Sequence, residues 1–351
     1  MRIVVLAGGT STERDVSISS GLLVAAALRE KGHQVVLLDV FTGYEKDILD
    51  VDELFAQNYS FTSSAKVGET ISDIDEIKEN RRDKSCRFIG ENVIDICSCA
   101  DITFFALHGG AGENGQVQAA LDLMGLKYTG SGYLGSALAM NKGLTKSVLT
   151  QHKVTTPRGE IFRSEEETAV WKIFPCVVKP CSGGSSVGIT IVETREDFRQ
   201  SVKEAFSYGE SEIVVEQYVK GREFAVGVIG GKALPPIEII PKTGFYDYKT
   251  KYQAGAAEEK CPADITAEQD RIMREAAEQA YSALHLESYA RMDFILDKGN
   301  NAYCLEANTL PGMTPTSLLP QEAAVEGVGY ADLCELIIKE SMKKYEKKGC
   351  L

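Results

Sequence analysis

The chain has 351 residues, of which 44% are hydrophobic and 25% are charged, and its formal net charge is −13. A chain of this length exceeds the size of one hydrophobic core, so two or three domains are expected. The acidic balance excludes a general nucleic-acid-binding protein, because that class needs a basic surface. No run approaches the roughly 20 apolar residues of a membrane span. The nine cysteines include no C-x-x-C pair, and residues 1–7 lack the pattern of a signal peptide. We therefore expect a cytoplasmic protein without a disulfide framework that binds neither nucleic acid nor a membrane.

The N-terminal region carries a β-α-β pattern followed by a long polar stretch. This start is typical of an open parallel sheet. Residues 41–95 are charged and lack strong periodicity, which indicates an insertion with short helices. The predicted elements are a strand at Ile3–Leu6, a turn at Gly8–Ser11, a helix at Val16–Glu30 closed by Gly32, and strands at Gln34–Asp39 and Ile102–Leu107.

A loop rich in glycine and serine, residues 181–188, lies between two β-branched runs and follows Lys179 closely. Backbone N–H groups without side chains in the way can wrap phosphate oxygens, and the lysine adds a positive charge. Because the loop joins two strands, it predicts a hairpin that covers a nucleotide and not a P-loop. The alternative is a plain glycine-rich turn that exists only for its backbone geometry. Lys142, Lys146 and Lys251 are further candidates for a basic pocket that binds an anion.

Helices and strands alternate through the remainder of the chain. The predicted helices are Gln116–Met124, Ser136–Gln151, Arg195–Phe206 with Thr194 as its N-cap, Ala267–Leu284 and Tyr330–Tyr345, whose lysine-rich end is expected to be solvated. The predicted strands are Ile213–Gln217, Phe224–Ile229, Lys232–Ile240, Tyr289–Leu296 and Ala302–Ala307.

The last two of these strands form a candidate hairpin that carries two carboxylates. With the turn centred at 299–300, antiparallel pairing places Asp293 opposite Glu306 and Arg291 opposite Asn308, all on one face. Two carboxylates opposite each other repel unless a cation lies between them. Asn308 adds a third oxygen, and such a donor set suits Mg²⁺. The alternative is a polar face on which Arg291 forms an ion pair with Glu306.

A phosphate-binding loop and a magnesium hairpin are the two parts that an ATP-using enzyme needs, and here the sequence resembles the D-alanine–D-alanine ligases of the ATP-grasp superfamily. The resemblance covers nearly the whole chain except about residues 41–95. Its motifs, in family order, are G-G-T-S-T-E-R-D-V-S at 8–17, H-G-G-A-G-E-N-G at 108–115, Y-T-G-S-G at 128–132, S-A-L-A-M-N-K at 136–142, the loop at 177–190, F-Y-D-Y-K-T-K-Y at 245–252, the hairpin at 291–308 and N-T-L-P-G-M-T-P-T-S-L at 308–318.

This resemblance implies an α/β fold with a three-domain ATP-grasp architecture. A Rossmann-like parallel sheet at 1–130 precedes two α+β domains, at 131–215 and 216–351, that clasp ATP. The resemblance further implies that ATP phosphorylates the carboxylate of the first D-alanine, that the amine of the second attacks the acyl phosphate, and that the dipeptide serves peptidoglycan precursor synthesis. The resemblance also implies a homodimer and two Mg²⁺ ions, for which Mn²⁺ can substitute, held by Asp293, Glu306 and Asn308.

The resemblance assigns nucleotide contacts between residues 142 and 251. Lys142 and Lys179 contact the ATP phosphates, and Lys251 reaches the transferred phosphoryl group from a closing loop. The remaining nucleotide contacts are Gly184, Ser185 and Ser186 in the glycine-rich loop, Glu216, Gln217 and Val219 around adenine, and Glu223 on the ribose hydroxyls.

The same resemblance assigns the amino-acid sites. Glu13 binds the ammonium of the first D-alanine, whereas a charge at the helix dipole is its plain alternative. Arg291 and the Gly312 N–H stabilise the oxyanion. Ser317 and the Leu318 backbone bind the carboxylate of the second D-alanine. Tyr252 interacts with Ser185 and Glu13 and so connects the lid to the substrate site. His108 is a further candidate, ranked below Glu13 because a lone histidine is more often structural.

Several positions depart from the family pattern or bear on the second substrate. Asn114 and Asn141 each replace a usual aspartate, and Gln217 stands where lysine is frequent. Tyr252 and Leu318 favour D-alanine as the second substrate over D-lactate and D-serine. The open alternatives are a ligase with one of those second substrates, another carboxylate–amine ligase, and a nucleotide-binding protein without catalytic activity.

Overall fold

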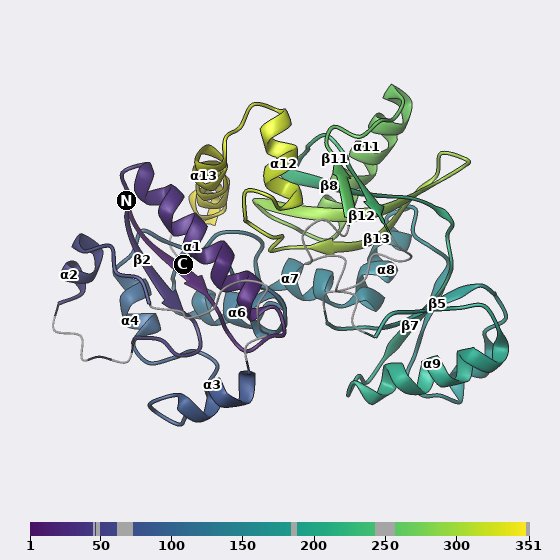
Figure 1. The fold of residues 1–351 in the computed structure, drawn as a ribbon, viewed down its shortest axis with the longest axis horizontal. Helices are drawn as coiled ribbons and strands as arrows, with labels where there is room; N and C mark the ends of the chain where they lie inside the picture. The colour runs from purple at the N-terminus through teal and green to yellow at the C-terminus, as the bar shows by residue number, and fades with distance from the viewer. Residues whose placement is uncertain (45, 47–49, 62–72, 184–187, 243–256, 349–351) are drawn as a thin grey trace.

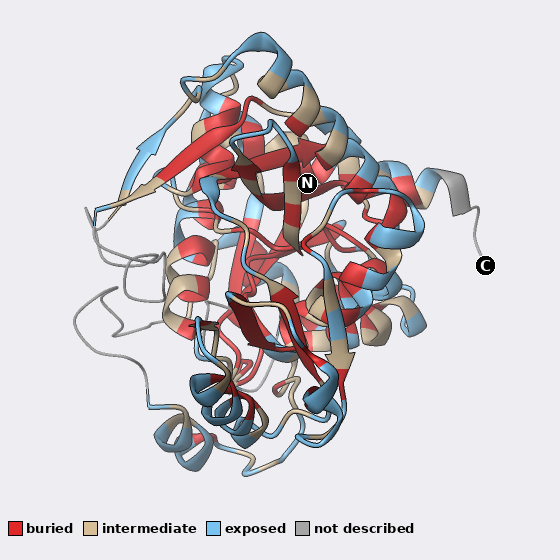
Figure 2. Cartoon of the chain, turned by 90° about the vertical axis from the view of Figure 1, so that its right-hand side faces the viewer, coloured by how far each residue is buried: buried red, intermediate tan, exposed pale blue. Residues whose placement is uncertain are grey.

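The computed structural model describes residues 1–44, 46, 50–61, 73–183, 188–242 and 257–348. Within these residues the chain forms three β-sheets, each covered by helices (Figure 1). Most strands are buried, whereas the helices expose their outward faces (Figure 2). The eight cysteines of the described residues are free thiols. The expected α/β class is therefore confirmed, while the division at 1–130, 131–215 and 216–351 stays a prediction.

The N-terminal sheet contains three parallel strands in the order β2-β1-β3. The central strand β1 (Arg2–Ala7) lies between β2 (Gln34–Asp39) and β3 (Ile102–Phe105). Residues 3–7 are fully buried, as the continuous apolar run of a parallel strand requires. Helix α1 (Arg14–Glu30) connects β1 to β2. Because β1 pairs with β2 on one side and β3 on the other, a topological switch point forms at the carboxyl ends of β1 and β3.

Short helices occupy the described parts of residues 41–95, as expected. They are α2 (Val51–Ala56), α3 (Ile74–Asn80) and α4 (Val93–Ser98). The first two begin after an aspartate whose side chain accepts backbone N–H groups. Helices this short, with few buried residues, give no sustained apolar period, which explains the weak sequence signal.

The middle sheet is antiparallel and has the strand order β4-β7-β5-β6. Helix α9 (Arg195–Ser207) packs against it through Phe198 and Val202. The Thr194 side chain caps this helix by accepting the Asp197 N–H, as predicted. The other elements are β4 (Gly159–Phe162), η1 (Glu167–Val170), β5 (Cys176–Pro180), β6 (Thr190–Val192) and β7 (Ile213–Gln217).

The C-terminal sheet has the order β11-β10-β8-β12-β13, with β9 paired to β8. Helix α11 (Ala267–Ala283) packs on one face, where Met292 and Phe294 are fully buried. Helix α12 (Leu318–Val325) packs against β8 as well. The strands are β8 (Gly221–Ile229), β9 (Lys232–Ala233), β10 (Ile237–Pro241), β11 (Ala257–Lys260), β12 (Tyr289–Asp297) and β13 (Ala302–Asn308).

Two predicted elements are each split in the structure. The single helix predicted for 136–151 is wrong: α7 (Tyr133–Met140) ends at Asn141, and α8 (Lys142–Gln151) begins there. Asn141 has extended backbone angles, and its side chain accepts the Leu144 N–H, so it both ends one helix and caps the next. The strand predicted for 232–240 is interrupted between β9 and β10, where the sequence has two consecutive prolines.

The closing helix α13 (Tyr330–Lys348) lies beside α1, so the end of the chain returns to the N-terminal sheet (Figure 1). The expectation of a wholly solvated lysine-rich end is wrong, because Lys344 is buried. Its Nζ atom donates to the Gly130 carbonyl at 2.8 Å and lies 3.8 Å from the centre of the Tyr128 ring. This helix therefore connects the C-terminal region to the N-terminal one.

Candidate functional site

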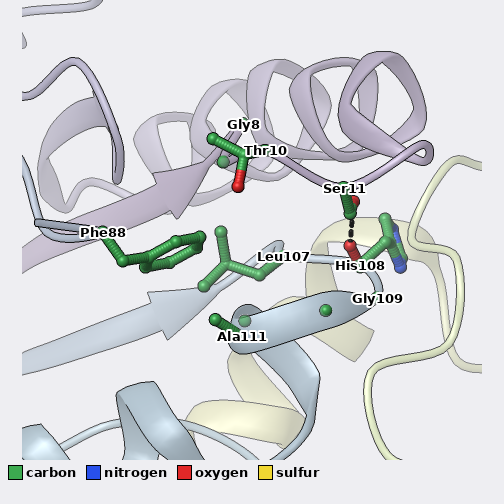
Figure 3. A pocket seen from close by; sticks show the side chains of 11 residues that line it. Gly8, Thr10, Ser11, Phe88, Leu107, His108, Gly109 and Ala111 are labelled. Carbon is green, nitrogen blue, oxygen red and sulfur yellow. Dashed lines mark hydrogen bonds between the residues drawn. The ribbon is translucent and has the colours of Figure 1, made fainter. Parts of the chain in front are cut away.

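A crevice lies at the switch point of the N-terminal sheet. There the turn after β1 meets the loop that leads from β3 into α5 (Gly110–Glu113) and α6 (Gln116–Leu123). The carboxyl ends of strands at a switch point are where open α/β sheets bind ligands. A cavity of about 50 Å³ opens between the two glycine-rich loops (Figure 3). It is lined by Gly8, Gly9, Thr10, Ser11, Phe88, Leu107, His108, Gly109, Gly110, Ala111 and Gly112.

A buried ion pair fixes the first of these loops. The Arg14 guanidinium contacts the Asp39 carboxylate, and Arg14 Nη1 donates to the Gly9 carbonyl at 2.6 Å. Asp39 also accepts the Phe41 N–H at 2.8 Å and is fully buried. In dinucleotide-binding sheets, an acidic residue at a comparable place binds the ribose. Here Arg14 occupies that carboxylate, so Asp39 holds the loop in place and is not exposed to a nucleotide.

Glu13 immediately precedes α1 and lies beside the second loop. Its side chain makes no capping hydrogen bond to α1. The alternative role of Glu13, a charge that only stabilises the helix N-terminus, therefore has no capping bond to support it. A Cβ atom at Gly109 would lie 2.7 Å from Glu13 Oε2, and Gly109 has a φ of +64°. Only glycine therefore allows this loop to approach the Glu13 carboxylate.

His108 is buried between the first loop and the C-terminal region. Its Nε2 atom lies 3.4 Å from Ser20 Oγ, which also accepts the Met313 N–H at 3.4 Å. Burial lowers the pKa of His108, and the Arg291 charge acts in the same direction, while Glu13 opposes the shift. The imidazole is therefore neutral near pH 7 and suits a hydrogen-bonding role.

The segment that follows β13 brings Gly312 and Ser317 together. A Cβ atom at Gly312 would lie 2.8 Å from Ser317 Oγ. The Ser317 hydroxyl accepts the Thr314 N–H at 3.1 Å, which orders the loop. Leu318 is the first residue of α12, and it is buried against Ala225 of β8.

The carboxylate hairpin has the predicted pairing, with Asp293 opposite Glu306 and Arg291 opposite Asn308. The predicted turn position is wrong, because Leu296 pairs with Ala302, one residue out of that register. A β-bulge at Leu305 adds the missing residue and restores the register at the carboxylates.

The side chains of the hairpin form a local polar network. Arg291 Nε and Nη2 donate to the two Asp293 carboxylate oxygens at 2.7 and 2.9 Å. Asn308 Nδ2 lies 3.1 Å from Asp293 Oδ2. The predicted alternative partner of Arg291 was Glu306, yet Arg291 forms an ion pair with Asp293, and Lys142 Nζ lies 3.9 Å from Glu306 Oε2. Lys142 also donates to the Gly183 carbonyl at 2.6 Å, at the edge of the glycine-rich loop.

A buried triad joins α8 to the middle sheet. The Glu216 carboxylate of β7 contacts Lys179 of β5 and lies 2.8 Å from Lys146 Nζ. Lys146 Nζ also donates to Thr156 Oγ1 at 2.9 Å and to the Pro157 carbonyl at 2.7 Å. Burial alone would raise the pKa of Glu216, but the two lysines lower it, so the carboxylate is ionised. The triad carries one positive charge in excess, which an anionic ligand can neutralise.

The other predicted nucleotide contacts lie on a path between two sheets. Gln217 ends β7 and pairs with Cys176, and Val219 lies in the connection to β8. Glu223 lies in β8, paired with Ile295 of β12. Gly184, Ser185, Ser186, Lys251 and Tyr252 lie outside the described residues.

The sequence-based prediction gave no specific role to three polar groups of the site region. They are the Arg14–Asp39 pair, Lys146 and Glu113. Lys146 was named only as a candidate for a basic pocket, and its position one helical turn after Lys142 was the available signal. Glu113 lies within the H-G-G-A-G-E-N-G motif, but no local pattern shows which backbone groups it binds. In the described part of the chain no cluster of three His, Cys, Asp or Glu side chains forms a metal site, and the predicted set depends on an amide.

Comparisons with known proteins match almost the whole chain. A model described as D-ala D-ala ligase N-terminus matches residues 2–131, and one described as D-ala D-ala ligase C-terminus matches residues 143–339. A D-alanine–D-alanine ligase of Pediococcus pentosaceus is 42% identical over 99% of this chain and 99% of its own. One of Lacticaseibacillus casei is 43% identical over 98% and 97%.

Solved structures agree with these matches. The D-alanine–D-alanine ligase from Bacillus anthracis complexed with ATP has a TM-score of 0.72 and 28% identity, covering 99% of this chain and 100% of its own. The VanG D-Ala:D-Ser ligase from Enterococcus faecalis has a TM-score of 0.74 and 25% identity, covering 97% and 99%. In the residues that the structure describes, no helix is both long and apolar enough to span a bilayer. From its sequence, its fold and the two family models, the chain belongs to the D-alanine–D-alanine ligase family of ATP-dependent enzymes with the ATP-grasp fold.

Proposed function

We propose that this chain joins two D-alanine molecules into D-alanyl-D-alanine at the expense of ATP, for peptidoglycan precursor synthesis in the cytoplasm. The single observation that carries the proposal is the register of the hairpin. It places two carboxylates opposite each other, with Lys142 beside Glu306 and next to the glycine-rich loop. This arrangement supplies groups of both charges where a nucleotide triphosphate and a metal ion would meet.

In the first step, the carboxylate of the first D-alanine attacks the γ-phosphorus of ATP, and ADP leaves. Lys142 and Lys179 are proposed to bind the phosphate oxygens, and Lys251 the transferred group. Glu216, Gln217 and Val219 are proposed to hold adenine, and Glu223 the ribose. The positive charge in excess on the buried triad supports an anionic ligand beside Lys179.

The hairpin is proposed to hold Mg²⁺, as two ions for which Mn²⁺ can substitute. Asp293, Glu306 and Asn308 fit this group chemically, because two carboxylates and an amide oxygen on paired strands are hard oxygen donors. When bound, the metal supplies charge neutralisation for the ATP phosphates. Arg291 donates a hydrogen bond to Asp293 in the structure. The guanidinium is therefore close enough to the proposed metal ligands to contact the reacting group.

In the second step, the neutral amine of the second D-alanine attacks the acyl carbon, and inorganic phosphate leaves. Arg291 and the Gly312 N–H are proposed to stabilise the oxyanion. Glu13 binds the ammonium of the first D-alanine, with His108 beside it. Ser317 and the Leu318 N–H receive the carboxylate of the second. The closeness of Gly312 to Ser317 Oγ supports one shared site.

A lid and a dimer complete the proposal. Gly184, Ser185 and Ser186 are proposed to cover the phosphates, and Tyr252 to tie the lid to Ser185 and Glu13. Excluding water protects the acyl phosphate from hydrolysis. Sedimentation of the purified chain tests the proposed homodimer. A chain that remains monomeric at all concentrations contradicts the proposal.

A second candidate has D-serine as the second substrate. The similarity to the VanG D-Ala:D-Ser ligase favours it, whereas Leu318 stands where the D-serine type is expected to have arginine. The test is phosphate release with Mg²⁺-ATP and D-alanine, alongside L-alanine, D-serine and D-lactate, with each product identified by mass. Dipeptide from D-alanine alone supports the proposal, D-alanyl-D-serine supports the second candidate, and no phosphate release with any of them overturns both.

A further inference from the structure

Glu113 is a buried carboxylic acid that spans two loops from distant parts of the chain. Its Oε2 atom accepts the Gly109 N–H at 3.0 Å, within the loop after β3. Its Oε1 atom accepts the Leu310 N–H at 3.1 Å and lies 3.4 Å from Thr309 Oγ1, in the loop after β13. One side chain therefore binds backbone groups of both loops.

Each of the two loops lies at one end of the proposed first substrate. Gly109 lies against the Glu13 carboxylate, which is proposed to bind the ammonium. Leu310 lies two residues before Gly312, whose N–H is proposed to bind the oxyanion. The bonds of Glu113 thus set the spacing between the ammonium site and the oxyanion site of a single amino acid.

The surroundings of Glu113 disfavour a charged carboxylate at this position. Burial and the nearby negative charge of Glu13 raise its pKa to about 7, against the two backbone N–H groups and Arg291, which act in the opposite direction. Tyr289 of β12 faces it as well. An apolar side chain of similar volume would avoid this cost, but it could not accept hydrogen bonds from both loops.

We propose that Glu113 is a positioning residue whose carboxyl group ties the loop at the ammonium site to the loop at the oxyanion site. The inference rests on the proposed function, since it needs those two loops to bind the first D-alanine. Glu113 itself touches neither substrate nor ATP. Its effect is expected at the D-alanine site and not at the nucleotide site.

The test compares Glu113→Gln with the intact enzyme. Glutamine keeps the volume and one acceptor oxygen, so one loop loses its bond. The kcat/KM for D-alanine is expected to fall roughly 10- to 100-fold, as for a lost hydrogen bond to a charged group, while the KM for ATP stays within about twofold. Faster amide hydrogen exchange in residues 309–313 is expected in the same variant.

A matched control is available in Glu287→Gln. The Glu287 carboxylate also accepts a glycine N–H from a distant segment, that of Gly132 at 3.1 Å, but it binds neither of the two loops. This variant is expected to keep both KM values and kcat. Glu113→Asp, whose shorter side chain cannot span both loops, is expected to resemble Glu113→Gln.

The outcomes separate the two proposals. If the intact enzyme forms no dipeptide, the proposed function fails, whatever Glu113 does. If the intact enzyme is active and folded Glu113→Gln keeps its kcat/KM for D-alanine within about twofold, the positioning role is wrong. Loss of thermal stability alone, with unchanged constants for the folded fraction, likewise overturns it, because that result describes a purely structural carboxylate. Equal losses for D-alanine and ATP also contradict it.

Discussion

Glu306 is the hairpin carboxylate that lies opposite Asp293, and it forms an ion pair with Lys142. Replacing it with glutamine removes the negative charge and one carboxylate oxygen from the proposed metal site while keeping the volume. Dipeptide formation by Glu306→Gln is expected to fall at least about 100-fold, because the charge on the phosphates is no longer neutralised. Phosphate release under saturating ATP and D-alanine measures this.

Asp297→Asn provides the matched control for that variant. Asp297 lies on the same hairpin, but its carboxylate accepts the Gly299 and Asn301 N–H groups of the exposed turn. Full activity is expected there. A Glu306→Gln enzyme as active as the Asp297→Asn control would rule out the metal assignment.

Lys146 contacts Glu216 Oε2, whereas Lys179 contacts Oε1, and Lys146 is itself bound by Thr156 and Pro157. In Lys146→Met the buried carboxylate loses one of its two cations, and breaking a buried pair typically costs about 3–5 kcal/mol. We expect a lower melting temperature and a raised KM for ATP, because Lys179 shifts toward Glu216. Thermal unfolding and initial rates measure the two effects.

The control for this variant is Lys203→Met, on the exposed face of α9. It makes the same change of charge and shape away from the triad. Unchanged ATP kinetics in folded Lys146→Met would show that the triad does not position Lys179.

At the scale of elements, Asn141 decides where α7 ends and α8 begins. Its side chain accepts the Leu144 N–H at 2.9 Å. Asn141→Ala is expected to lower the free energy of unfolding by about 1 kcal/mol through loss of the cap. Asn141→Asp keeps the cap and adds a negative charge at a helix N-terminus, so stability is expected to hold or to rise slightly.

Chemical denaturation of both variants checks this, and their comparison separates the cap from the charge. If alanine and aspartate give equal stability, the Asn141 side chain does not cap α8. The result also bears on the family pattern, because aspartate is the usual residue at this place. Retained activity in Asn141→Asp would indicate that asparagine and aspartate at position 141 are both compatible with the reaction.

At the scale of the whole molecule, Glu113 links the N-terminal and C-terminal parts, and its titration affects global stability. Its pKa is raised in the fold from 4.5 to about 7, so the folded state binds a proton more tightly than the unfolded chain does. The contribution is full below about pH 4.5 and is lost as the pH rises through 7. This loss is on the order of 3 kcal/mol.

Denaturation of the intact chain and of Glu113→Gln at several pH values measures how much Glu113 contributes to the free energy of unfolding. The difference in unfolding free energy between the two proteins is expected to change between pH 4.5 and 7.5 by that amount, in favour of the intact chain at low pH. A difference that does not vary with pH would show that Glu113 titrates normally in the fold.

The sequence by itself determined the local elements and the chemistry of the motifs. Apolar runs such as residues 3–6 specify buried strands, and their period needs no tertiary information. The pairing of Asp293 with Glu306 was predicted from an assumed turn centre that is one residue out of register, and the predicted pair is correct because a bulge at Leu305 compensates for that shift. The break at Asn141 was missed because it depends on the extended backbone angles of this residue and on its bond to the Leu144 N–H, which the sequence pattern does not show.

Only the tertiary structure decided which distant groups meet. Glu113 and Leu310 are 197 residues apart, and Lys146 meets Glu216 only because α8 packs beside β7. Likewise, Arg14 and Asp39 form an ion pair beside the Gly8–Gly9 turn. Asp39 therefore stabilises this turn and is not available to bind a ribose. Sequence patterns encode the period and chemistry of each element, whereas contacts across loops depend on how the sheets pack, which no single segment contains.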